Sequence, residues 1–128
     1  MSLSVLIVDD SATVRAVITK TLDLAGLPVA CVYEASNGEE ALNILAEHHI
    51  DLLFSDINMP VMSGVEMIER MAARGLLETI RVVVVSTEGS ATRIEQLKSK
   101  GVSAYLRKPV APETIRKVVH DIVGAQKC

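Results

Sequence analysis

The stretch SVLIVDD, residues 4 to 10, is a continuous apolar run, rich in β-branched residues, that ends in two carboxylates. An uninterrupted apolar run of this length is typical of a strand that is covered on both faces, as in a parallel sheet. IRVVVVS (80–86) has the same character, and three further stretches complete a set of five: VACVYEA (29–35), DLLFSD (51–56) and AYLRK (104–108). The sequence therefore predicts five strands.

Helical patterns separate these strands, with apolar residues spaced i, i+3, i+4 and i+7 and with capping residues at the ends. The predicted helices run from about Val14 to Ala25, from Asn37 to Glu47, from Ser63 to Gly75, from Ser90 to Lys100, and from Pro112 onward. Regular alternation of strands and helices implies a parallel sheet with helices on both faces. Since such crossovers are right-handed, a doubly wound α/β sheet is the economical solution.

Length and composition limit the class of protein. The 128 residues suit one domain, which we expect to cover residues 1–128, and 49% apolar with 23% charged residues is the balance of a folded globular chain. No apolar run approaches the roughly 18 residues of a membrane span, and a strand pattern that begins by Leu3 leaves no room for a signal peptide. Cys31 and Cys128 look unpaired, so we expect a reducing, cytoplasmic location.

Chemically capable side chains follow four of the five predicted strands, at the sheet edge where doubly wound proteins bind ligands. They are Asp9 and Asp10, then Asp56, then Ser86, Thr87 and Glu88, then Lys108. Each alone has an ordinary explanation, because acids often cap helices and a lone lysine is usually solvated. Together, three carboxylates repel one another, and Mg²⁺ or Mn²⁺ would relieve that repulsion. A lysine and a hydroxyl beside the metal indicate phosphoryl transfer, with Asp56 as the nucleophile.

Four motifs carry a resemblance to a known family: LIVDDS (6–11), SDINMPVMSG (55–64), VVSTEG (84–89) and YLRKP (105–109). Over about residues 3–124 the chain resembles the bacterial response-regulator receiver domain, and most closely the stand-alone CheY-like chemotaxis receivers. The resemblance implies a flavodoxin-like fold with five helices and the strand order 2-1-3-4-5, for which CheY is itself a standard example. It implies a signalling domain that catalyses its own phosphorylation and dephosphorylation, and not a metabolic enzyme.

The resemblance also assigns roles to the acidic residues. Asp56 would accept a phosphoryl group from a sensor histidine kinase or its phosphotransfer domain. Asp10, Asp56 and the backbone carbonyl of Asn58 would bind Mg²⁺, and Asp9 would act through a bound water. Asn58 and Glu88 would position the water that removes the phosphoryl group, which implies a lifetime of seconds to a few minutes.

The remaining motif residues would respond to the phosphoryl group. Ser86 would hydrogen-bond its oxygens and Lys108 would pair with them. Tyr105 would turn inward as Ser86 moves, and the peptide bond between Lys108 and Pro109 is expected to be cis.

Charge is distributed unevenly, with a net −8 over residues 1–88 and +5 over residues 89–128. Chance scatter of solvated charge is one interpretation; the other is a basic face for an acidic or amphipathic segment of a partner, such as a flagellar motor switch protein or a kinase. The candidate residues of this basic face are Arg93, Lys98, Lys100, Arg107, Arg116 and Lys117. No helix-turn-helix or aromatic signal accompanies the charge, so we expect no nucleic-acid partner, and we expect a monomer.

Other readings fit less well. Haloacid-dehalogenase-type phosphatases end their first strand in D-x-D, whereas Asp9 and Asp10 are adjacent. A flavodoxin-like cofactor binder needs a phosphate-cradling loop, yet DDSATVR (9–15) contains no glycine. His48 and His49 are adjacent and do not face one another, and no third metal ligand is evident for them or for His120. Within the receiver family, the alternative is a single-domain phosphorelay intermediate that passes its phosphoryl group to another histidine domain.

Overall fold

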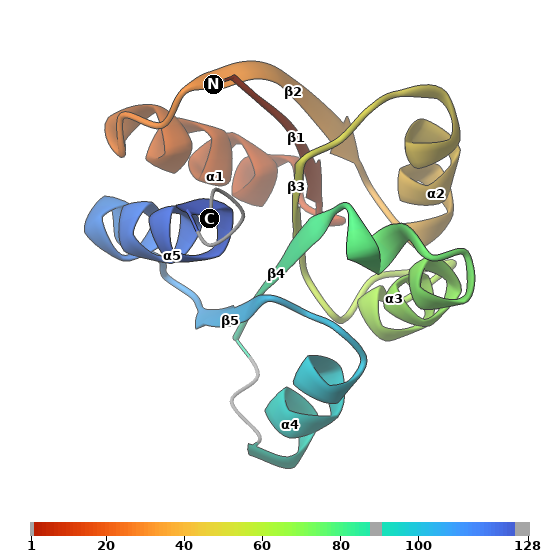
Figure 1. The fold of residues 1–128 in the computed structure, drawn as a ribbon. Helices are drawn as coiled ribbons and strands as arrows, with labels where there is room; N and C mark the ends of the chain where they lie inside the picture. The colour runs from red at the N-terminus through yellow and green to blue at the C-terminus, as the bar shows by residue number, and fades with distance from the viewer. Residues whose placement is uncertain (1, 88–90, 125–128) are drawn as a thin grey trace.

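The computed structural model describes residues 2–87 and 91–124 and contains one five-stranded sheet in the order β2-β1-β3-β4-β5 (Figure 1). All neighbouring strands are parallel. The strands are β1 (Leu3–Val8), β2 (Val29–Ala35), β3 (Leu52–Ser55), β4 (Arg81–Ser86) and β5 (Ala104–Arg107). The helices are α1 (Ala12–Leu24), α2 (Gly38–Glu47), α3 (Gly64–Ala73), the 3₁₀ helix η1 (Leu76–Glu78), α4 (Ala91–Ser99) and α5 (Pro112–Gly124). The predicted α/β fold and strand order are therefore confirmed.

Local sequence signals explain where the helices begin and end. Ser11, Asn37 and Ser63 precede α1, α2 and α3, and each side-chain oxygen accepts the backbone N–H of the residue three positions on. Such caps satisfy donors that a helix start leaves free. Gly26 follows α1 with φ 70° and Gly75 follows α3 with φ 72°, a conformation that glycine adopts without steric cost.

The sheet has a hydrophobic core on each face, and the three central strands β1, β3 and β4 contribute to both. α1 and α5 cover one face, and α2, α3 and α4 cover the other (Figure 1). The first core includes Phe54 of β3 together with Ile18 and Leu22 of α1 and Ile115 and Val119 of α5. The second includes Leu53 with Met67, Ile68 and Met71 of α3. The long apolar runs of β1 and β4 are buried on both sides, as their sequences predict.

β2 differs from the central strands because it forms an edge of the sheet. Ala30, Cys31 and Val32 are exposed in consecutive positions, and Ala35 is the one buried residue of the strand. Within the described part of the chain, no helix is long and apolar enough to cross a membrane.

Candidate functional site

Three carboxylates meet where β1 and β3 end. β1 ends at Val8 and β3 at Ser55, so Asp9, Asp10 and Asp56 are the first residues beyond two neighbouring strands. Each offers an oxygen, and these oxygens all lie within 4.8 Å of one another. A set of carboxylate oxygens at this spacing is the donor set that Mg²⁺ and Mn²⁺ prefer, so these residues fit the divalent cation that the sequence predicts.

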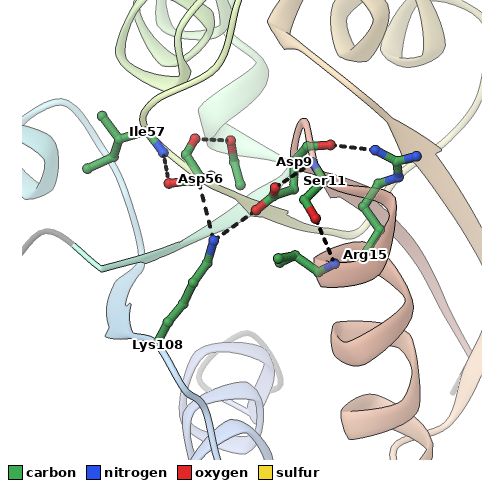
Figure 2. Close-up of polar contacts among 8 residues, drawn as sticks. Asp9, Ser11, Arg15, Asp56, Ile57 and Lys108 are labelled. Carbon is green, nitrogen blue, oxygen red and sulfur yellow. Dashed lines mark hydrogen bonds and ion pairs between the residues drawn. The ribbon is translucent and has the colours of Figure 1, made fainter.

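Asp9 is the most deeply placed of the three, with 2% of its surface exposed. Its Oδ1 accepts the backbone N–H of Ser11 at 2.9 Å, and its Oδ2 accepts a hydrogen bond from Lys108 Nζ at 3.0 Å (Figure 2). Its own N–H donates to the carbonyl of Ala35 at 3.0 Å, and its carbonyl accepts from Arg15 Nη1 at 2.6 Å. Burial of the carboxylate charge is therefore compensated by the Ser11 N–H and the Lys108 ammonium, while Ala35 of β2 and Arg15 of α1 fix the backbone of Asp9.

Lys108 joins Asp9 to Asp56. Its Nζ lies 3.0 Å from Asp9 Oδ2 and 3.3 Å from Asp56 Oδ2, and Figure 2 shows the ammonium pointing between the two carboxylates. Partial burial lowers the pKa of this lysine, but the hydrogen bond to Asp9 and the negative charges of Asp56 and Asp9 together outweigh burial and raise the pKa above its ordinary value. The ammonium is therefore charged at neutral pH.

Asp56 is half-buried, and its carboxylate faces the cluster. Its Oδ1 accepts the backbone N–H of Ile57 at 2.7 Å, while its backbone carbonyl accepts from the hydroxyl of Ser55, also at 2.7 Å. Its N–H donates to Val8 of β1 at 3.0 Å. The backbone of Asp56 is thus fixed to the neighbouring strand, which holds the carboxylate beside Asp9.

The loop after Asp56 folds back onto the end of β3. Gly64 N–H donates to the carbonyl of Ile57 at 2.7 Å, and a Cβ at position 64 would collide with the backbone carbonyl oxygen of Asp56. At the tip of the loop Val61 has φ 67° and is 76% exposed, and Met62 N–H donates to Pro60 across it at 2.7 Å. A β-branched residue at positive φ is strained, so this loop is held by its contacts and not by the preference of Val61.

The remaining predicted site residues lie around this cluster. Ser86 is the last residue of β4, 1% exposed, and its carbonyl accepts the N–H of Lys108 at 2.9 Å. Asn58 is exposed in the loop after Asp56, and Tyr105 of β5 is half-buried against the core that contains α3. The Lys108-Pro109 peptide bond is cis, in agreement with the expectation. Glu88 lies outside the described residues.

The predicted basic face lies on α4, β5 and α5 and in the turn after α4. Its exposed members are Lys98, Lys100, Arg107, Arg116 and Lys117, whereas Arg93 is half-buried. Lys100 pairs with Glu69 of α3 at 3.6 Å. Five of the six predicted residues are therefore accessible on the surface.

Arg15 is a residue near the site that the sequence interpretation missed. It comes from α1, and besides the carbonyl of Asp9 it contacts Glu34 of β2, with Nε 2.9 Å from Oε1. The available signal was a basic residue in the first turns of the helix that follows the two acids at the end of a strand. Its contact with a backbone carbonyl, however, has no signature in sequence.

Comparison with known proteins decides the family. The model of the response regulator receiver domain matches residues 5–120. The chain belongs to this receiver family. It is 32% identical to a chemotaxis protein CheY homolog of Campylobacter jejuni, over 95% of this chain and 93% of the relative. It is also 32% identical to the two-component response regulator ORR3 of Oryza sativa, over 93% of this chain and 89% of the relative.

A solved structure gives the same result. The chemotaxis response regulator CheY4 of Vibrio cholerae superposes with a TM-score of 0.81 at 32% identity, covering 95% of this chain and 99% of that chain. The chain is therefore a CheY-like receiver domain, which places it in two-component signalling. The readings as a haloacid-dehalogenase-type phosphatase or a cofactor-binding flavodoxin are excluded by this membership.

Proposed function

We propose that this receiver domain accepts a phosphoryl group on Asp56 from a histidine kinase or its phosphotransfer domain. The observation that carries the proposal is the convergence of the carboxylates of Asp9, Asp10 and Asp56 with the ammonium of Lys108, 3.3 Å from Asp56 Oδ2. Three acids and one lysine at the end of a parallel sheet form a site for an anion and a divalent cation together.

The reaction is an in-line displacement at phosphorus. A carboxylate oxygen of Asp56 attacks the phosphorus of phosphohistidine, the P–N bond breaks, and its electron pair remains on the imidazole nitrogen. Asp10, Asp56 and the backbone carbonyl of Asn58 would hold Mg²⁺, with Mn²⁺ as a substitute, and Asp9 would act through a bound water. The cation would neutralise negative charge on the transferring group.

Besides the cation, the ammonium of Lys108 places a positive charge beside Asp56. Because its pKa is raised, it carries the proton throughout the physiological range and can donate it in a hydrogen bond to a phosphoryl oxygen on Asp56. Ser86, buried at the end of β4, would donate its hydroxyl to another phosphoryl oxygen. Movement of Ser86 toward that group would open space for Tyr105 to turn inward, while Asn58 and Glu88 would position the water that hydrolyses the acyl phosphate.

Phosphorylation would switch the affinity for a partner protein through the basic face on α4, β5 and α5. The similarity to a protein named as a chemotaxis protein favours a partner of the flagellar motor switch type. The similarity to a plant two-component response regulator keeps the alternative of a phosphorelay intermediate. Binding of phosphorylated protein to a motor component, measured beside transfer to a histidine phosphotransfer domain, separates the two.

The central proposal is tested by incubating the protein with Mg²⁺ and acetyl phosphate and measuring the intact mass. The wild type should gain the mass of one phosphoryl group, and Asp56→Asn should gain none. Asp23→Asn, which removes an exposed carboxylate from α1, is the matched control and should be phosphorylated like the wild type. Equal phosphorylation of wild type and Asp56→Asn would overturn the assignment of Asp56.

A further inference from the structure

Arg15 approaches the acidic cluster from the side of Asp9 that lies opposite Lys108 (Figure 2). Its Nη1 donates to the carbonyl oxygen of Asp9 at 2.6 Å, and its Nε donates to Glu34 Oε1 at 2.9 Å. The side chain is 17% exposed, so most of it is enclosed between α1 and the strands. Because a guanidinium is a rigid planar group, contacts at two of its nitrogens fix its orientation.

The carbonyl that Arg15 holds belongs to the peptide unit between Asp9 and Asp10. That unit is planar, so fixing its oxygen also fixes the direction in which the chain enters Asp10. Asp9 has additional side-chain bonds to Ser11 and Lys108. Asp10, in contrast, is exposed, and within the described residues its carboxylate makes no hydrogen bond or ion pair. The position of the Asp10 carboxylate therefore depends on its backbone, and that backbone is held by Arg15.

We propose that Arg15 is a positioning residue for divalent-cation binding, which sets the carboxylate of Asp10 toward Asp9 and Asp56, and that Glu34 holds Arg15 in place. The inference rests on the proposed function, because it assumes that the three carboxylates bind Mg²⁺. It gives β2 a part in the site, although β2 supplies no carboxylate to the cluster.

Positioning and simple electrostatics predict opposite results for Arg15. Arg15 carries a positive charge close to the cation site, so its removal should tighten Mg²⁺ binding if charge alone mattered. Loss of positioning should weaken binding. Loss of Glu34, which carries the opposite charge, should weaken binding on both grounds, because it removes a negative charge near the cation and frees the guanidinium. Arg15 is therefore the residue at which the two explanations differ in sign.

The experiment is calorimetric titration of the unphosphorylated protein with Mg²⁺. Arg15→Met keeps the long stem and removes both hydrogen bonds, and we expect an affinity about tenfold weaker, the lower end of the range for residues that support metal ligands. Glu34→Thr should weaken binding by a smaller factor, and Arg15→Lys, which can still donate to the carbonyl of Asp9, should recover part of the loss. Lys20→Met removes the same charge from the same helix at an exposed position and should bind Mg²⁺ at least as tightly as the wild type.

The outcomes separate this inference from the proposed function. Wild-type binding together with unchanged or tighter binding by Arg15→Met would overturn the positioning role. If Arg15→Met does not fold, Glu34→Thr decides, since it leaves the arginine present, and wild-type affinity in that variant would overturn the inference. Absence of Mg²⁺ binding by the wild type would instead overturn the proposed function.

Discussion

Substitution of Gly64 by alanine should damage both the stability and the chemistry of the protein. In the structure a Cβ at position 64 would meet the carbonyl oxygen of Asp56 and lie 3.0 Å from Ile57 Cα. Both neighbours are backbone atoms of the segment that carries Asp56, the proposed phosphoacceptor, so no flexible side chain can move aside. The loop must move, and the hydrogen bond of 2.7 Å from Gly64 N–H to the carbonyl of Ile57 is lost or lengthened.

The magnitude follows from three contributions to the free energy of unfolding. The lost hydrogen bond removes about 1 kcal/mol. Steric overpacking removes a further 1–3 kcal/mol or so. The reduced entropy of the unfolded chain returns about 0.4–1 kcal/mol. We therefore expect Gly64→Ala to lower the free energy of unfolding by roughly 1–3.6 kcal/mol. We also expect much slower phosphorylation, because a displacement of about 1 Å at a reacting group can cost a factor of about 100.

Gly75→Ala is the matched control. Gly75 has φ 72°, and apart from its two chain neighbours no atom of the described residues lies within 4 Å of the position that a Cβ would take there, so alanine meets backbone strain but no collision. We expect a loss of about 1 kcal/mol, from the left-handed conformation, and an unchanged phosphorylation rate. Urea unfolding and the rate of phosphorylation by acetyl phosphate measure both effects. If the two variants lose equal stability and Gly64→Ala is phosphorylated at the wild-type rate, the argument from close approach is refuted.

Three further predictions concern charge, metal and capping. The raised pKa of Lys108 means that its ion pairs stabilise the fold below the unfolded-state pKa of 10.5 and lose this effect as pH rises through the folded-state pKa. The difference in unfolding free energy between wild type and Lys108→Met should therefore be constant from pH 7 to about pH 9 and become smaller in stronger alkali. A difference that becomes larger in alkali would contradict this prediction. Mg²⁺ at a hundred times its dissociation constant should raise the free energy of unfolding by about 2.7 kcal/mol, and removal by chelation should reverse the gain; a melting temperature insensitive to Mg²⁺ would contradict metal binding by the folded state. Ser11→Ala removes the hydroxyl that accepts Val14 N–H at 3.2 Å and should cost about 1 kcal/mol in urea unfolding, whereas a neutral result would show that solvent replaces this cap.

Local patterns were sufficient to predict most of the fold. Val14 to Ala25, capped by Gly26, matches α1 within two residues, and Asn37 caps α2 as its spacing to Glu40 predicts. These signals are carried by residues within a turn or two of each other, so a single sequence contains them. The strand order came from the resemblance and not from spacing, because no local pattern specifies which strands are neighbours.

Features that depend on contacts between distant segments were not predicted. VACVYEA reads as an ordinary strand, yet its exposure follows from its place at the sheet edge. Gly64 reads as a helix start, but its need for glycine comes from the carbonyl of Asp56, eight positions earlier. Arg15 was missed for the same reason, since its partners are a backbone carbonyl and an acid on another strand.

Lys108 connects the acidic cluster to the surface that we propose for partner binding. Its ammonium bonds to acids that follow β1 and β3, and its backbone N–H donates to Ser86 of β4, while Arg107 before it is exposed on β5. A phosphoryl group on Asp56 would compete for the same ammonium, and its oxygens carry more charge than the carboxylate oxygen now held at 3.3 Å. Since the lysine is attached to the end of β5, any change in its partners acts on the strand that carries both Tyr105 and Arg107. We therefore expect Lys108 to couple the charge of Asp56 to the β5 part of the basic face, beside the movement proposed for Ser86.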